Sequence, residues 1–288
     1  MRLLNILKEN NIIKVSPENH LSYALSRLST SHDAAFVFDE ENKYYGVINP
    51  YYCVIKSSYP GNTKVAHCLT HPPRIYVNYS LTKVAELFNQ SKIHYLPVFD
   101  PQTEKFLGIV SARRVINHIK TLPIFKIKIK QLIKLKKPPV IISENSSVAE
   151  ALNLFKIYKF SKLIVTNREG KLKGVLSYYD LISFMMMPKN KEKRGERKGN
   201  KTHLTNKTIK YFFKTYVLTL DENKNLYEVI DLIINKKIGS VVVVNKEKRP
   251  VNIITTKDLL KFYIREEKNG FFKQVSSGIG KLLSRKKT

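Results

Sequence analysis

Apolar residues recur at positions i, i+3, i+4 and i+7 in four separate stretches of the chain. This spacing places the apolar side chains on one face of a helix, so each stretch predicts a short amphipathic helix. A polar residue that can accept a hydrogen bond from the unpaired amides of the first helical turn precedes each stretch. The four helices are expected to begin at Leu21, Leu81, Val148 and Leu226, after the capping residues Asn19, Ser80, Ser147 and Asn225.

An apolar segment with strand character follows each predicted helix, and a polar turn joins it to a second such segment. The first segments span 34–38, 95–99, 162–166 and 240–244. The unit therefore reads helix, strand, turn, strand, helix, and the chain contains it four times. From the start of the helix to the polar residue that ends the second strand, the distance is 28 to 30 residues in every copy (21 to 49, 81 to 111, 148 to 177, 226 to 255). Such a constant register indicates an internal repeat.

The second strand of the unit ends in a short polar motif in repeats three and four. Ser177 is followed three residues later by Asp180, and Thr255 by Asp258, where the chain becomes helical. A hydroxyl and a carboxylate at this spacing are typical of a capping box, in which both side chains satisfy backbone amides at a helix start. A helix start with unpaired amides is also a place where phosphate binds, so the capping and ligand-binding interpretations are compatible.

The motif is incomplete in the first two repeats. Repeat two keeps Ser111 but has Arg114 in the position of the carboxylate, an arrangement suited to phosphate and not to ribose. Repeat one has Asn49 in place of the hydroxyl, and Tyr52 or Cys53 where the carboxylate would fall. We therefore expect the C-terminal half to hold the principal ligand site.

The helix–strand–strand–helix unit ending in Gly-x-x-Ser/Thr-x-x-Asp closely resembles the CBS domain, named for cystathionine beta-synthase. The resemblance implies an α+β fold in which repeats pair into two Bateman modules, one from repeats one and two and one from repeats three and four. Two modules in one chain are also similar to the gamma regulatory subunit of AMP-activated protein kinase, where they form a disc around a central cavity. The expected domains are repeats at 1–58, 59–122, 123–187 and 207–268, with a basic insertion at 188–206 and a basic tail at 269–288.

Nucleotide-binding CBS domains use the Asp of the motif for the ribose hydroxyls and the Ser or Thr near phosphate. The resemblance therefore implies that Asp180 and Asp258 bind ribose, with Ser177, Thr255 and Ser111 near phosphate. A carboxylate suits a vicinal diol because it only accepts hydrogen bonds, and charge-assisted bonds are the stronger kind. The expected ligand is AMP, ADP, ATP or S-adenosylmethionine, and the sequence does not distinguish among them.

Other candidates come from the loops that the family often turns toward phosphate or base. The candidates are Lys159, Lys236, Ile238 and Gly239, before the first apolar segment of their repeats, the equivalent Ser91–His94 run of repeat two, and Val140, Ile141 and Val217, which would lie against adenine. Surface lysines and core residues with no ligand would give the same pattern at these positions.

The net charge of +28 changes the range of partners to be considered. A basic excess favours polyanions such as nucleic acid or an anionic membrane, but 40 lysines against 11 arginines also fit a general composition bias. The charged insertion at 188–201 has no aromatic residue of the kind that stacks on bases. The tail, Phe271–Lys287, places apolar groups at near-helical spacing beside basic ones and is a candidate for a membrane surface or a partner's groove.

Signs of catalysis, metal binding or membrane insertion are absent from the sequence. The seven histidines are scattered, and there is no phosphate loop, zinc-protease motif or nucleophile elbow. Two cysteines, Cys53 and Cys68, fit buried thiols in a reducing compartment, so a cytoplasmic location is expected. No segment reaches the roughly 20 apolar residues needed to span a bilayer.

These observations lead to one main hypothesis and two alternatives. The chain is expected to be a non-enzymatic regulatory protein that senses an adenosine-containing ligand and modulates a protein partner, with homodimer formation left open. The alternatives are nucleic-acid binding through the basic surface and a CBS scaffold in which the motif only caps helices.

Overall fold

The computed structural model describes residues 3–28, 34–91, 93–185 and 206–270. Each repeat forms a three-stranded sheet in which the first strand pairs parallel with the second and the second pairs antiparallel with the third. The sheets comprise β1 (Lys14–Val15), β2 (Ala35–Phe38) and β3 (Tyr44–Ile48); β4 (Ile75–Tyr76), β5 (Tyr95–Phe99) and β6 (Phe106–Ser111); β7 (Ile141–Ser143), β8 (Lys162–Thr166) and β9 (Leu172–Ser177); and β10 (Thr219–Asp221), β11 (Ser240–Val244) and β12 (Pro250–Thr255).

Helices flank each sheet, as the apolar periodicity predicts. They are α1 (Leu21–Arg27), α2 (Leu81–Gln90), α3 (Ala112–Ile119), α4 (Ile129–Ile133), α5 (Val148–Tyr158), α6 (Tyr178–Met185), α8 (Leu226–Asn235) and α9 (Thr256–Lys268). In repeat one a π-helix, Tyr51–Lys56, takes the place of the second helix and follows Pro50. No helix within the described ranges is long and apolar enough to cross a membrane.

The predicted cap positions are confirmed for three helices and wrong for the first. Ser80 accepts from the Lys83 amide and Ser147 accepts from the Glu150 amide, whereas the Asn225 amide donates to Glu228 Oε1 at 3.3 Å. Helix α1 instead begins after His20, whose side chain makes no capping bond. The carboxamide oxygen of Asn19 accepts from the Ser16 amide, so it stabilises the preceding turn.

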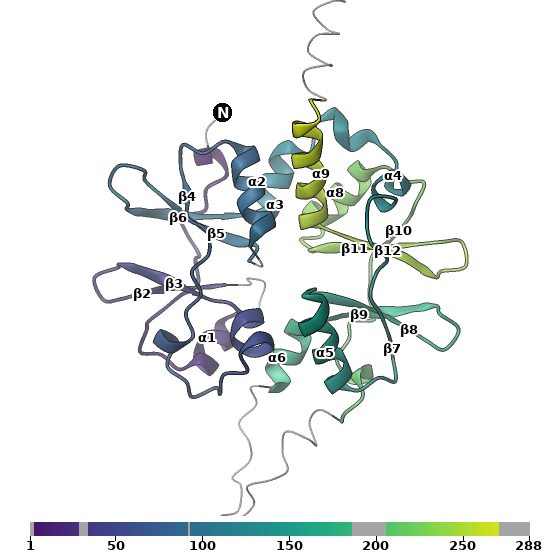
Figure 1. Cartoon of the computed structure of the whole chain (residues 1–288), viewed down its shortest axis with the longest axis horizontal. Coiled ribbons are helices and arrows are strands. Elements are labelled where there is room, and N and C mark those ends of the chain that lie inside the picture. Colours follow the sequence, from purple (N-terminus) through teal and green to yellow (C-terminus); the bar gives the residue numbers. More distant parts are fainter. Residues whose placement is uncertain (1–2, 29–33, 92, 186–205, 271–288) are drawn as a thin grey trace, which may run out of the picture.

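The repeats pair through their sheets into two modules, as the resemblance implies, and the modules form a flat disc (Figure 1). Rings from the facing sheets of repeats one and two interlock; those of Phe38 and Phe106 meet edge to face with centroids 5.0 Å apart. Repeats three and four meet at the Leu172 amide, which donates to the Lys248 carbonyl at 3.2 Å.

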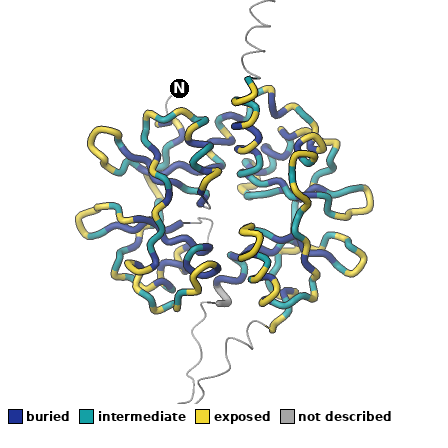
Figure 2. The backbone as a smooth tube through the Cα atoms, in the orientation of Figure 1, coloured by how far each residue is buried: buried dark blue, intermediate teal, exposed yellow. Residues whose placement is uncertain are grey.

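Helices close the disc by joining the two modules. Helices α2 and α9 pack together between repeats two and four, where the hydroxyls of Thr82 and Tyr263 lie 3.1 Å apart. Between repeats one and three, the rings of Tyr51 and Tyr178 lie 6.0 Å apart. Two apolar cores result, one along each of these contacts. Buried residues follow the strands, whereas the hairpin turns at the rim are exposed (Figure 2).

The chain segment that leads into a repeat crosses the sheet of the paired repeat. Backbone bridges form between Lys8 and Ile109, Thr70 and Val47, and Lys214 and Val175. A glycine lies next to each crossing, and a Cβ at Gly174 would approach the Lys214 carbonyl oxygen to 2.4 Å. The absence of a side chain therefore permits the crossing segment to lie directly on the strand, beside the polar motif.

Candidate ligand site

Asp180 lies in the first turn of α6, directly after β9, because the apolar strand ends at Ser177 and the helix begins with the next residue. Its Oδ2 accepts from the Ser177 amide at 2.8 Å, and the Ser177 hydroxyl accepts from the Tyr179 amide at 3.1 Å. On the other side, Oδ1 lies 3.6 Å from the ammonium of Lys214, which belongs to the crossing segment. The Asp180 side chain is 11% exposed and that of Lys214 is 76% exposed. The carboxylate is thus fixed by the backbone and faces a solvated cation.

Burial is the main influence on the Asp180 carboxyl group. It raises the pKa of Asp180, while the Ser177 amide and the charges of Lys214 and Lys162 act in the opposite direction. The geometry therefore holds a carboxylate partly out of water, where a hydrogen bond from a ligand hydroxyl is stronger than at the surface.

Lys162 begins β8, is partly buried, and carries an amine in the same neighbourhood. Its Nζ donates to the Ser240 hydroxyl of the paired repeat at 2.8 Å. Burial lowers the pKa of Lys162 to about 8; the charge of Asp180 opposes this change, and the charges of Lys214 and Arg113 add to it. The Nε of Arg113 is buried and has no hydrogen-bond partner among the described residues. Several cations close to one another with few anions nearby are a suitable environment for a phosphate group.

Asp258 occupies the equivalent place at the start of α9, with a different neighbour. Its Oδ2 accepts from the amide and the hydroxyl of Thr255, at 2.8 and 2.7 Å, and forms an ion pair with the ammonium of Lys136 at 2.8 Å. The same ammonium donates to the Ile253 carbonyl at 2.5 Å. Burial lowers the pKa of Lys136, and the neighbouring Asp258 carboxylate partly offsets this effect. The capping box predicted here is therefore present, together with an internal cation.

The motif of repeat two contacts its own helix and the N-terminal segment. The Ser111 hydroxyl caps α3 by accepting from the Arg114 amide at 3.2 Å. The Arg114 guanidinium donates to the carbonyls of Leu7 at 2.7 Å and Ile6 at 3.2 Å. A charge that would suit a phosphate thus holds the N-terminal segment against the repeat.

The corresponding positions of repeat one are part of the core. Asn49 is fully buried, and its carboxamide oxygen accepts from the Tyr51 amide at 3.0 Å. The Cys53 thiol donates to the Cys68 carbonyl at 3.4 Å, and burial raises the pKa of Cys53 to about 12. These contacts give the two cysteines the buried, unreactive character that the sequence predicts.

The loop residues are placed unequally around the Asp180 site. Gly239 lies beside Lys162, since a Cβ there would be 3.3 Å from the Lys162 ammonium nitrogen. Ile238 packs against the core of repeats two and four. Lys159 and Lys236 are exposed at the ends of α5 and α8, and Lys159 has a left-handed backbone with φ of 55°.

The three residues predicted to contact adenine lie at the entry to the first strands. The Val140 carbonyl accepts from the Ile164 amide at 3.2 Å, and Val217 is half-buried shortly before β10. Ile141 is 45% exposed, so a purely core role is wrong for this residue. Lys92, the insertion at 188–205 and the tail at 271–288 lie outside the described residues.

Sequence reasoning missed the three lysines that surround the two carboxylates. Lys162 has a weak signal, because it is a charged residue at the start of an otherwise apolar strand. Lys136 and Lys214 lie in crossing segments rich in lysine, where nothing in the sequence distinguishes them from surface residues. Lys162 lies near Asp180 because β8 pairs with β9 inside repeat three, whereas Lys136 and Lys214 reach their carboxylates only through the pairing of repeats.

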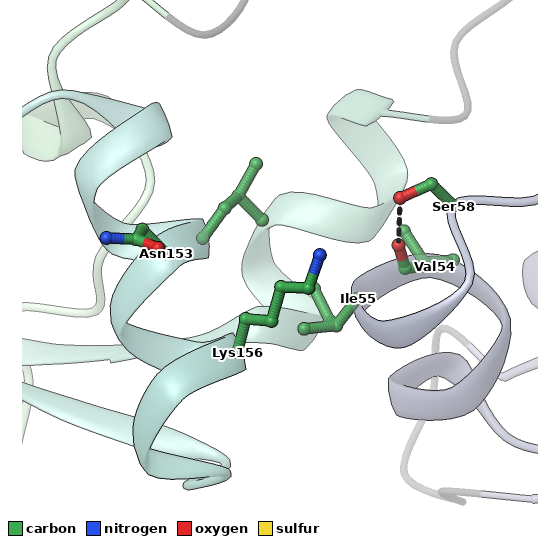
Figure 3. A pocket seen from close by; sticks show the side chains of 6 residues that line it. Val54, Ile55, Ser58, Asn153 and Lys156 are labelled. Carbon is green, nitrogen blue, oxygen red and sulfur yellow. Dashed lines mark hydrogen bonds between the residues drawn. The ribbon is translucent and has the colours of Figure 1, made fainter.

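A cavity of about 190 Å³ lies apart from these residues, between the π-helix of repeat one and α5 of repeat three (Figure 3). Val54, Ile55 and Lys156 contribute to its lining, and the Ser58 hydroxyl donates to the Val54 carbonyl at its edge. None of the predicted site residues lines it. Groups of three or more metal-binding side chains are absent from the described part of the chain.

Comparison with known proteins identifies the repeats. The profile of the CBS domain matches residues 65–121, 129–187 and 209–265. Among curated proteins, two uncharacterized proteins of Methanocaldococcus jannaschii are similar: MJ1404 is 28% identical over 131 residues, and MJ1225 is 25% identical over 127 residues. These alignments cover 46% and 43% of the chain, and the chain spans only 31% and 45% of the relatives' lengths.

Solved structures show the same overall fold. The structure of MJ1225, described as a candidate archaeal homologue of g-AMPK, superposes with a TM-score of 0.76 at 19% identity, covering 91% of this chain and all of that one. An uncharacterized conserved protein from Pyrococcus horikoshii gives a TM-score of 0.58 at 17% identity, covering 91% of this chain and 99% of that one. At this identity the likeness concerns the fold alone, and the arrangement is the one expected from the gamma-subunit resemblance. With three matching segments over more than half of its length, the chain belongs to the CBS-domain family.

Proposed function

We propose that the chain is a regulatory binding protein that takes an adenosine nucleotide at the Asp180 site. The observation that carries the proposal is the combination of a backbone-fixed, largely buried carboxylate with the partly buried amine of Lys162, whose pKa burial lowers. A carboxylate that only accepts hydrogen bonds suits the ribose diol, and a desolvated amine suits a phosphate. The family resemblance supports the same roles for the Asp and Ser of the motif.

The charges around the site favour a phosphorylated ligand over S-adenosylmethionine. The charges of Lys214 and Arg113 act electrostatically on Lys162, and Asp180 is the one anion among the influences on Lys162. A phosphate relieves the repulsion among these cations, whereas a sulfonium group adds to it. AMP, ADP and ATP are therefore the preferred candidates.

Regulation requires that the ligand bind two conformations with different affinity. Asp180 and Lys162 belong to repeat three, whereas Lys214 and Ser240 belong to the segment and sheet of repeat four. A nucleotide that contacts both repeat three and repeat four would favour the conformation in which these two repeats are closest. A protein partner that contacts both repeats would then sense occupancy.

Isothermal titration calorimetry with AMP, ADP, ATP and S-adenosylmethionine tests the proposal. We expect binding of the nucleotides, loss of that binding in Asp180→Ala, and an affinity about 10- to 100-fold weaker in Asp180→Asn, which keeps the shape but not the charge. Glu247→Ala removes a carboxylate from an exposed turn and serves as the control. Nucleotide affinity that is unchanged in both Asp180 variants would refute the assignment.

A further inference from the structure

The sheet of repeat four differs from the other three sheets at one position, next to the place where a chain segment crosses it. Where the other repeats have glycine, repeat four has Asn252, which is 2% exposed. A Cβ at Gly108 would approach the Lys8 carbonyl oxygen to 2.6 Å, so a side chain at this position is incompatible with a directly apposed segment. The bridges observed at the other three sheets have no counterpart here among the described residues.

Side chains replace the missing backbone bridge. The Asn252 carboxamide donates to the Lys137 carbonyl at 3.4 Å and fills the space between strand and segment. Lys136 reaches back across this gap, and its ammonium donates to the Ile253 carbonyl at 2.5 Å. The substitution of one glycine therefore accompanies the insertion of a lysine side chain into the site.

The inserted lysine pairs with the motif carboxylate of repeat four more closely than the crossing lysine of repeat three pairs with Asp180. Lys136 Nζ lies 2.8 Å from Asp258 Oδ2, and the two side chains are 17% and 20% exposed. In the equivalent pair the distance from Lys214 to Asp180 is 3.6 Å, and Lys214 is 76% exposed. Separating the buried pair would leave both charges poorly solvated, whereas moving Lys214 returns it to water.

We infer that Lys136 is an internal occupant of the Asp258 site, which closes this site to nucleotide while the Asp180 site remains open. The ammonium adds a third donor to Asp258 Oδ2, beside the amide and the hydroxyl of Thr255, so the carboxylate is neutralised from within the protein. The inference rests on the proposed function, because it assigns the same ligand class to the two sites. It predicts one nucleotide site per chain, although two repeats carry the complete motif.

Counting the binding sites in variants tests this inference. Calorimetric titration of the full chain with AMP is expected to give one site in the wild type and one in Asp258→Ala. Lys136→Met is expected to give a second site, within about tenfold of the affinity of the first, which disappears in Lys136→Met/Asp258→Ala. Lys137→Met changes the adjacent exposed lysine and should retain one site.

A second variant covers the case in which Lys136→Met fails to fold. Asn252→Gly keeps the lysine and restores the glycine of the other repeats, so the segment can approach the strand and the second site should open. Circular dichroism establishes that each variant is folded. The inference would be overturned by a single binding site in every one of these two variants that folds, or by two binding sites in the wild type.

The outcomes also separate this inference from the proposed function. AMP binding by Lys136→Met but not by the wild type would refute the Asp180 assignment and support the occupant role of Lys136. Absence of AMP binding in every folded variant would overturn both.

Discussion

Replacing Lys162 with methionine is expected to stabilise the protein while weakening nucleotide binding. Burial lowers the pKa of this lysine from its ordinary value of 10.5 to about 8, so the charged amine costs the folded state about 3 kcal/mol at neutral pH. Methionine has similar length and no charge to desolvate. After allowing about 1 kcal/mol for the lost hydrogen bond to Ser240, we expect Lys162→Met to raise the free energy of unfolding by about 1–2 kcal/mol at pH 7.

The pH dependence gives a sharper test than the absolute stability. Between about pH 8 and 10.5 the unfolded chain keeps a proton on Lys162 that the folded protein has released. The contribution of this lysine to the free energy of unfolding therefore rises with pH across that window and is constant below it. Lys162→Met removes this rise, whereas Lys237→Met, which changes an exposed lysine, should keep it.

Urea unfolding followed by circular dichroism from pH 6.5 to 9.5 measures both quantities. The difference in unfolding free energy between Lys162→Met and the wild type should shrink as pH rises above 8. Nucleotide affinity of the wild type should also fall above this pH, by up to about tenfold per pH unit, because bound phosphate requires the protonated amine. Parallel pH profiles, or a Lys162→Met variant that is less stable than the wild type at pH 7, would contradict the buried-cation account.

Two further predictions concern the crossing segments. Gly174→Ala should lower the free energy of unfolding by about 1–3 kcal/mol, because its Cβ would lie 2.4 Å from a backbone oxygen. Gly239→Ala should lower it by less than about 1 kcal/mol, because its Cβ meets only the movable end of a lysine side chain. Equal losses of unfolding free energy in urea would contradict the packing argument. Arg114→Ala should lower the free energy of unfolding by about 1–3 kcal/mol by releasing the Leu7 carbonyl, with nucleotide affinity unchanged in calorimetry. Weakened nucleotide binding in Arg114→Ala would instead show that repeat two contributes to the site.

The local structure was predictable because each repeat contains its own pattern. Strands 95–99, 162–166 and 240–244 have the predicted bounds, and β2, predicted at 34–38, begins one residue later at Ala35. The capping geometry of Ser177 and Thr255 follows from residues three positions apart, so it is visible in the sequence. Pairing of the repeats came from the family resemblance and not from any local signal.

The parts of the site that depend on pairing were not predictable. Lys136 is 117 residues from the carbonyl to which it donates, and Lys162 is 78 residues from Ser240. The sequence of repeat four displays Asn252 in place of glycine, but the consequence depends on how closely another segment approaches. These side chains meet their partners only when two repeats pack together. The Ser177/Asp180 and Thr255/Asp258 motifs therefore look equivalent in the sequence, although their surroundings in the structure differ.

The central claim is that an adenosine nucleotide binds at Asp180, and a crystal structure of the full chain grown with AMP tests it most directly. The account predicts density for one nucleotide, with the ribose hydroxyls within hydrogen-bond distance of the Asp180 carboxylate and the phosphate beside Lys162. A nucleotide bound elsewhere, or an empty Asp180 site at saturating AMP, would contradict it.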